Sequence, residues 1–213
     1  KDNLAHAEAS TRAQAYLTGY GQINAGSGAI NVKALGTATA NAVIAAAKVS
    51  ASIVNIGFNT VKAIVSAEQA AYVVGALIKA GSLTVQSDFN NANESTGATA
   101  SVGSNAGTKI SLATTDVSKA IAQITAKVRA YVSGAATEIN NALSVTVNAN
   151  AYAKSGVDNG VASVDGIKAA VQQTEATAGG TFEAFIEATQ DGDSHIKARS
   201  ININNYYKSI ADA

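Results

Sequence analysis

The densest group of side chains that could do chemistry is the run Asp191-Gly192-Asp193-Ser194-His195, with two carboxylates and an imidazole. Asp191 and Asp193 are candidate calcium ligands in a turn, because calcium prefers carboxylate oxygens. A calcium site needs about six or more oxygens, however, and the following residues do not supply them at loop spacing. The sequence therefore favours a solvated turn, and we expect no metal site and no cofactor.

Four carboxylates in the second half of the chain form the other group with catalytic potential. Parallel β folds host polysaccharide lyases and hydrolases, in which carboxylates beside Lys or Arg in a groove move protons. Here the carboxylates do not recur with basic residues at strand spacing, and only 14% of all residues are charged. We therefore expect no catalytic residues, and a β-helical polysaccharide-active enzyme is the alternative function. The four carboxylates are Asp158, Asp165, Glu175 and Glu183.

Aromatic residues recur along the chain at intervals of 56, 59 and 54 residues. All of them share the outward parity of their predicted strands, so we expect them to form a ladder on one surface. Such a ladder is a candidate binding surface for sugars or host proteins. Aromatic residues also pair across strands merely to cover them, and we favour this second role. The ladder residues are Tyr16, Tyr72, Tyr131 and Phe185.

The composition excludes several kinds of partner. The 213 residues carry 15 basic and 15 acidic side chains without a basic cluster, so we expect no nucleic-acid partner. Because the chain has no cysteine, it can form neither a disulfide nor a thiolate metal site. The longest apolar runs, such as residues 42–47, are far shorter than the roughly 20 residues of a membrane-spanning helix, so no transmembrane span is predicted.

The elements that must position these residues are predicted to be strands with one buried face. Small or apolar residues alternate with polar ones over 5–17, 30–44, 124–132 and 143–153, with Leu143 first among the inward residues of the last segment. A period of two is typical of strands. Alanine is a poor strand former, so its persistence at inward positions indicates a narrow interior between two strand faces.

Three segments also carry helical signals, at residues 61–79, 116–130 and 166–178, because they are rich in good helix formers. An Ala-rich helical fibre or coat protein is therefore a second alternative. The strict alternation within the second segment favours strands. Clusters of Gly and Asn mark turns, and residues 90–107 are expected to form the most protruding loop.

The chain contains an internal repeat of about 56 residues, with units near 12–67, 68–126, 127–180 and a partial unit at 181–213. Such repeats indicate an array in which each unit buries its apolar edge against the next. For alternating strands without proline this array is a parallel β-solenoid, and residues 1–213 form a single segment of it. Since one unit is long for a single coil, we expect two or three coils per unit, and about eight coils in a rod on the order of 40 Å long.

These repeats resemble a known class of proteins. The motif AYV at 71–73, followed by IKAG at 78–81, LTV at 83–85 and a long Asn, Ala, Ser and Thr tract, is similar to repeats of two-partner-secreted exoproteins of Gram-negative bacteria. This is the filamentous haemagglutinin class, and the leukotoxin-like filamentous adhesins of fusobacteria are the most similar. The resemblance implies a right-handed parallel β-helix within a longer secreted chain, and no catalytic motif.

The resemblance implies a role in attachment or toxicity at the host-cell surface. We therefore expect a non-enzymatic structural or adhesive segment, secreted or displayed on the bacterial surface through type V secretion. Its expected partners are a host-cell surface protein or glycan and, during secretion, an outer-membrane transporter. Both ends of the array should expose unpaired strand edges, which predicts end-to-end self-association.

Overall fold

The computed structural model describes every residue outside the positions 1, 20, 45–49, 92–96, 103–108, 135–136, 160–163 and 188–194. Within the described residues the fold is all-β, and no helix occurs. The three segments with helical signals lie in strands, apart from a short turn at residues 75–76. The alternative of an Ala-rich helical protein is therefore wrong.

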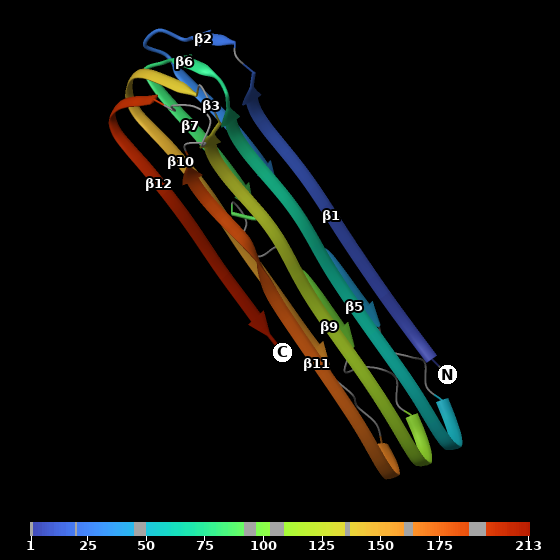
Figure 1. The fold of residues 1–213 in the computed structure, drawn as a ribbon. Helices are drawn as coiled ribbons and strands as arrows, with labels where there is room; N and C mark the ends of the chain where they lie inside the picture. Colours follow the sequence, from blue (N-terminus) through green and yellow to red (C-terminus); the bar gives the residue numbers. More distant parts are fainter. Residues whose placement is uncertain are drawn as a thin grey trace.

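Two parallel sheets make up the molecule (Figure 1). The first sheet holds four long strands in the order β1 (Asp2–Thr18), β5 (Ser50–Val74), β9 (Lys109–Ser133) and β11 (Val164–Ile186). The second sheet holds β2 (Gln22–Asn24), β3 (Ala29–Gly36), β4 (Ala40–Ile44), β6 (Leu77–Lys79), β7 (Ser82–Phe89), β8 (Ala98–Val102), β10 (Glu138–Asn159) and β12 (His195–Asp212).

The chain passes alternately through the two sheets, and we call one strand of the first sheet with its return through the second sheet a circuit. Each circuit pairs in parallel with the previous one, so that Tyr16 lies beside Tyr72, Tyr72 beside Tyr131, and Tyr131 beside Phe185. One repeat unit therefore corresponds to one circuit. The expectation of two or three coils per unit is wrong.

The length of the strands explains this error. The strands β5 and β9 have 25 residues each, where strands of about 5–6 residues are usual, so two strands and two turns use up a whole unit. A strand of this length spans roughly 80 Å, whereas a stack of four strands is only about 14 Å deep. The expected rod of eight coils is therefore wrong for this chain, whose long axis runs along the strands.

Alternate residues of the strands face opposite sides, as the period of two predicts. In β9, Ala120, Ala122 and Ile124 are fully buried. Gln123 and Thr125, at the alternate positions, lie on the outer face. The buried residues of both sheets form one continuous core of mainly Ala and Val. Small side chains at most inward positions let the two inner faces pack closely, and a few larger ones, such as Ile124 and Phe89, are buried among them.

Two expectations about individual positions are wrong. The pairing of β10 with β12 shifts register between Ile139 and Ala142, and the next residue, Leu143, is 61% exposed instead of inward-facing. Residues 98–102 of the expected protruding loop form β8, which pairs with both β4 and β10. The extra residue of an irregular pairing cannot be read from alternation alone, because the pattern is intact on both sides of it.

A buried asparagine holds the break between β3 and β4. Asn90 has a φ of 51°, in the left-handed region that asparagine tolerates better than most residues. Its side chain accepts a hydrogen bond from the Ala38 N–H at 3.0 Å and donates one to the Ala38 carbonyl at 3.2 Å. The side chain thereby satisfies backbone groups where the ladder is interrupted.

One inward position of β5 carries a polar side chain. Gln69 is fully buried and packs against Gly36, and neither amide atom has a hydrogen-bond partner among the described residues. A buried unpaired amide costs about 1–3 kcal/mol. We therefore expect Gln69→Met to raise the free energy of unfolding by about 1–3 kcal/mol in chemical denaturation. If Gln69→Met lowered it instead, the amide would have a partner that this packing does not contain.

Candidate functional site

The four repeat aromatics form one stacked ladder across the first sheet. The ring centroids of Tyr16 and Tyr72 are 5.2 Å apart, those of Tyr72 and Tyr131 are 5.0 Å apart, and those of Tyr131 and Phe185 are 5.0 Å apart. The planes of neighbouring rings differ by 3° to 11°. The parallel register of the strands places each ring directly beside the next.

This stacking limits what the ladder can bind. Neighbouring rings cover each other's faces, so the ladder presents mainly ring edges to solvent. A ligand that stacks on aromatic faces, such as a sugar, reaches only the outer faces of the two terminal rings, Tyr16 and Phe185. The geometry therefore fits the covering of adjacent strands better than a continuous sugar-binding platform.

The ladder contributes to stability through its inner rings, of which Tyr72 is one. Tyr72→Ala removes two stacked pairs, each of which adds about 0.5–1.5 kcal/mol beyond the buried area. We expect the variant to lose about 1–3 kcal/mol of free energy of unfolding, measured by denaturant titration. Tyr72→Phe should stay near the parent value, and so should Tyr206→Ala, outside the ladder. Equal losses in Tyr72→Ala and Tyr206→Ala would show that the stacking contributes nothing.

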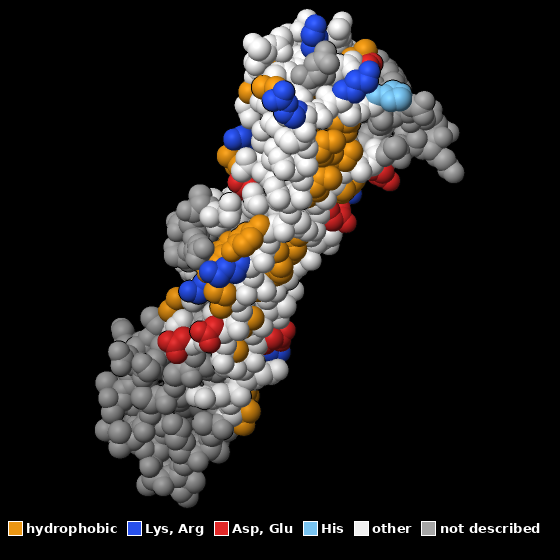
Figure 2. Space-filling view, turned by 90° about the vertical axis from the view of Figure 1, so that its left-hand side faces the viewer, with side chains coloured by type: hydrophobic (Ala, Val, Ile, Leu, Met, Phe, Trp, Pro, Cys, Tyr) orange, Lys and Arg blue, Asp and Glu red, His pale blue; other side chains and the backbone are white. Residues whose placement is uncertain are grey.

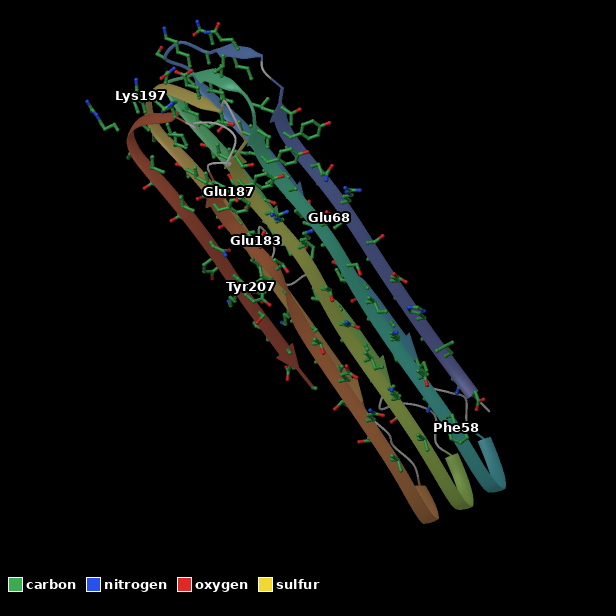
Figure 3. All side chains as sticks on the ribbon, viewed as in Figure 1. Phe58, Glu68, Glu183, Glu187, Lys197 and Tyr207 are labelled. Carbon is green, nitrogen blue, oxygen red and sulfur yellow. The ribbon has the colours of Figure 1, made fainter. Side chains whose placement is uncertain are left out.

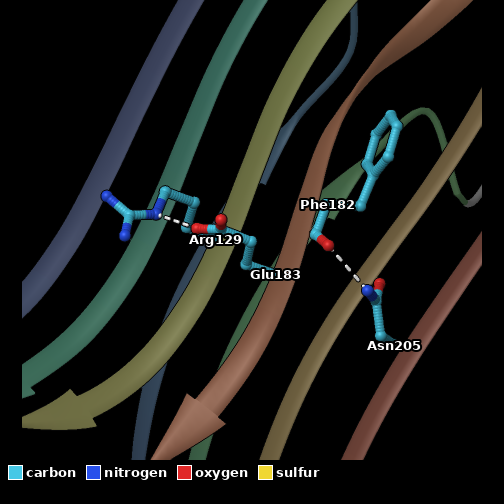
Figure 4. A network of polar contacts seen from close by, with 4 residues as sticks. All are labelled: Arg129, Phe182, Glu183 and Asn205. Atoms are coloured by element: carbon cyan, nitrogen blue, oxygen red, sulfur yellow. Dashed lines mark hydrogen bonds and ion pairs between the residues drawn. The ribbon is translucent and has the colours of Figure 1, made fainter. Parts of the chain in front are cut away.

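Charged side chains flank the ladder. The Arg129 Nε donates to a Glu183 carboxylate oxygen at 2.6 Å (Figure 4), and its guanidinium lies 5.2 Å from the ring centroid of Tyr131 and 5.6 Å from that of Phe185. A second ion pair joins Arg12 to Glu68, which is labelled in Figure 3, at 3.4 Å. Each ion pair bridges two neighbouring strands of the first sheet.

The Tyr131 hydroxyl is the group whose acidity this environment shifts. Burial raises the pKa of Tyr131 above its ordinary value of 10.0, and Tyr72 raises it further, while Arg129 lowers it. A raised pKa means that the folded chain holds the proton more tightly than the unfolded chain. The stability that neutral Tyr131 contributes is therefore complete below pH 10 and is lost as the pH rises above 10.

A pH titration of stability tests this shift. We expect the free energy of unfolding of the parent chain to fall above pH 10, and Tyr131→Phe to remove part of that fall, because it removes the titrating hydroxyl. A Tyr131→Phe curve that falls as steeply as the parent curve would contradict the assignment.

A shallow groove of about 460 Å³ crosses the outer face of the first sheet. Its floor holds the hydroxyls of Ser10, Ser66 and Thr125, which lie side by side in the register of β1, β5 and β9. The charged side chains of Arg12 and Glu68 line it. Hydrophobic, basic and acidic side chains are interspersed over the surface in Figure 2.

The carboxylates considered from the sequence do not meet in one place. Asp158 lies on β10 of the second sheet, whereas Glu175 and Glu183 lie eight residues apart on β11 of the first sheet. The backbone of Asp165 also belongs to β11. The candidate calcium ligands Asp191 and Asp193 lie outside the described residues. Among the residues that are described, no cluster of three or more His, Cys, Asp or Glu could hold a metal ion.

One cluster was not anticipated from the sequence. The rings of Phe182 on β11 and Tyr207 on β12 stack with centroids 3.9 Å apart. The Tyr207 hydroxyl donates to the Ala178 carbonyl at 3.2 Å, and the Asn205 side chain donates to the Phe182 carbonyl at 2.7 Å (Figure 4). The sequence did carry a signal for this cluster. Asn205 and Tyr207 of β12 lie opposite Ala149 and Ala151 of β10, so the last circuit has larger side chains in these two rows.

In the described part of the chain no helix has the length and apolar character needed to cross a membrane. Searches against family models, curated proteins and solved structures give no match for this chain.

Proposed function

We propose that the chain is a non-enzymatic structural and adhesive segment of a secreted or surface-anchored bacterial exoprotein of the filamentous haemagglutinin class. In this proposal it forms a right-handed parallel β-solenoid with one circuit per repeat unit. The observation that carries the proposal is the residue-for-residue pairing of each circuit with the one about 56 residues before it, as in β1 with β5.

The pairing supports a role as a stiff spacer. Backbone hydrogen bonds run through both sheets without an antiparallel interruption in the described strands. Side-chain ladders follow the same register: Asn3 donates to Asn59 at 2.8 Å, and Asn204 donates to Asn148 at 2.9 Å. The absence of proline fits this design, since each proline would remove a ladder donor.

The sheet topology supports the solenoid. Each strand of the first sheet is followed by one or three strands of the second sheet, and each new strand is added beside a strand of the same sheet in the previous circuit. This order is the one that a chain winding repeatedly around a shared core produces. The filamentous class and the bacterial cell surface rest on the resemblance of the AYV, IKAG and LTV motifs at 71–85.

The adhesive role places the partner, a host-cell surface protein or glycan, on the outer faces of the sheets. The shallow groove at Ser10, Ser66 and Thr125 offers hydroxyls in a row, with charged side chains beside it. The outer-membrane transporter would act on the chain before it folds. The missing cysteines suit such transport, because no disulfide can lock the chain.

A binding experiment tests the adhesive role. Fluorescently labelled chain is titrated onto cultured epithelial cells, with and without prior treatment by protease or glycosidase. We expect saturable binding that one of the two treatments abolishes, which also tells protein from glycan. The variant Ser66→Arg tests the groove, because the arginine fills the groove from an exposed position. We expect this variant to bind the cells less than the parent chain does.

Two results would overturn this function. One is a folded chain, shown by its far-ultraviolet spectrum, that binds cells no more than an unrelated protein does. The other is the release of new reducing ends or unsaturated products from acidic polysaccharides, which would make the chain an enzyme.

A further inference from the structure

We infer that the tyrosine ladder is an oxidative modification site, at which Tyr72 is joined covalently to a neighbouring ladder tyrosine as dityrosine when the chain meets hydrogen peroxide and a haem peroxidase. The product is a carbon–carbon bond between two circuits. This inference goes beyond the proposed function and does not depend on it, because it uses only the composition of the chain and the geometry of the ladder.

The composition directs one-electron oxidants to tyrosine. The chain has no Cys, Met or Trp, the other side chains that oxidants readily attack, but it has seven tyrosines. One-electron oxidation of a phenol, with loss of the hydroxyl proton, gives a phenoxyl radical. Because the chain has no thiol, thioether or indole to return an electron, the radical persists until it meets a second phenol.

The ladder holds two phenols side by side. Tyr72 and Tyr131 are register partners on β5 and β9, with ring centroids 5.0 Å apart and ring planes that differ by 6°. In rings so nearly parallel, equivalent atoms are separated by about the same distance as the centroids. The Cε carbons beside the two hydroxyls are therefore neighbours. Both strands have a paired strand on each side, so this geometry does not depend on the first or the last circuit.

The two rings can reach bonding distance by tilting. Both side chains stand on the outer face of the first sheet and are only partly buried. The outer torsion angle of a tyrosine side chain has a broad energy minimum, so a tilt costs little. The backbone spacing of about 4.8 Å between paired strands stays in place while the rings move. Coupling therefore requires ring rotation and no separation of the strands.

The coupling reaction balances with hydrogen peroxide as the oxidant. Tyr72 and Tyr131 each lose one electron and the hydroxyl proton to the peroxidase, and the unpaired electron of each radical spreads to the Cε carbons. One Cε of each ring then forms the new carbon–carbon bond. The hydrogens of these two carbons move through water to the phenolic oxygens, which restores both phenols. The two electrons and two protons convert one hydrogen peroxide into two water molecules.

Tyr72 is the partner that every coupling within the ladder requires. Its ring lies 5.2 Å from that of Tyr16 and 5.0 Å from that of Tyr131, measured between centroids. Tyr16 and Tyr131 themselves lie two strands apart, about 10 Å, and cannot couple directly. Phe185, which stacks on the other face of Tyr131, has no hydroxyl and forms no phenoxyl radical.

Oxidation of the folded full chain tests the inference. The chain is treated at low concentration with hydrogen peroxide and a haem peroxidase, and the monomer is isolated by electrophoresis under denaturing conditions. We expect dityrosine fluorescence in the monomer and a mass lower by two hydrogen atoms. Mass spectrometry of the tryptic digest should find the peptide of Tyr72 joined to the peptide of Tyr131 or Tyr16.

Two variants with one tyrosine changed to phenylalanine provide the comparison. Tyr72→Phe keeps a ring in the stack but removes the hydroxyl, so its monomer should contain no ladder dityrosine. The matched control is Tyr206→Phe, because Tyr206 is 53% exposed and no aromatic ring stacks on it among the described residues. This control should give the parent yield. Far-ultraviolet spectra show that both variants are folded.

The cross-link should also change the unfolding of the chain. A bond between Tyr72 and Tyr131 closes a loop across 59 residues, and a cross-link that closes a long loop restricts the unfolded chain. We expect the oxidised parent monomer to unfold at a higher denaturant concentration than the untreated parent. The same treatment of Tyr72→Phe should leave its unfolding midpoint unchanged.

Either of two results overturns the inference. One is a folded parent monomer without dityrosine, although the same reaction couples free tyrosine. The other is as much dityrosine in the monomer of Tyr72→Phe as in that of the parent. Cell binding is measured on chain that has not been oxidised, so a failure of this inference and a failure of the proposed function are distinguishable.

Discussion

Ala122→Glu is expected to unfold the chain or to lower its free energy of unfolding by about 3–5 kcal/mol, whereas Gln123→Glu is expected to leave it nearly unchanged. Ala122 is fully buried in β9 between the inner faces of both sheets. A carboxylate at this position has neither water nor a charged partner, and an uncompensated buried charge is among the most destabilising single changes.

The neighbouring position makes the comparison sharp. Gln123 follows directly on the same strand, so both variants have the same charge and the same local sequence. Only the side of the sheet differs. Guanidinium titration followed by far-ultraviolet circular dichroism measures both values. Equal losses in the two variants would mean that the even and odd positions of β9 do not face different environments.

Phe89→Ala is expected to lower the free energy of unfolding by about 3–5 kcal/mol, the usual range for truncating a buried phenylalanine. Phe89 has no exposed surface and is one of the largest fully buried side chains. It ends β7 directly before Asn90, whose hydrogen bonds to Ala38 hold the break between β3 and β4. A cavity at this position therefore also loosens that break.

Phe58→Ala serves as the matched control. Phe58 lies on β5 and is 46% exposed (Figure 3), so its truncation removes roughly half as much buried area and should cost about 1 kcal/mol. Thermal melts and denaturant titrations of the two variants give the comparison. A loss in Phe58→Ala that matches the loss in Phe89→Ala would contradict the core as described.

The strand character and the direction of the side chains could be predicted from the sequence. Alternation of alanine with polar residues is a local signal, and it correctly assigned the inward positions of β9 and the second half of β10. The spacing of Tyr16, Tyr72 and Tyr131 matches the pairing of the strands. These features survive in the sequence because every circuit meets the same packing constraint.

The number of circuits could not be predicted, because nothing in an alternating pattern says where a strand ends. The 25 residues of β5 read the same as several short strands, because Asn55, Gly57 and Asn59 within the run are residue types that also mark turns. The contact between Phe182 and Tyr207 could not be predicted either, because the change from Ala151 to Tyr207 marks an unusual position but not its partner. Those two residues belong to different sheets, and no spacing rule connects positions across the core.

Disulfide formation between Ser10→Cys and Ser66→Cys in one chain is the most direct test of the circuit. The two serines are exposed register partners on β1 and β5, and the strand spacing of about 4.8 Å lies within disulfide reach. We predict that mass spectrometry of the folded, oxidised chain finds this intramolecular bond, and not one between Ser10→Cys and Lys62→Cys, which lie about 13 Å apart. A folded β chain in which the 10–66 bond does not form would contradict one circuit per repeat.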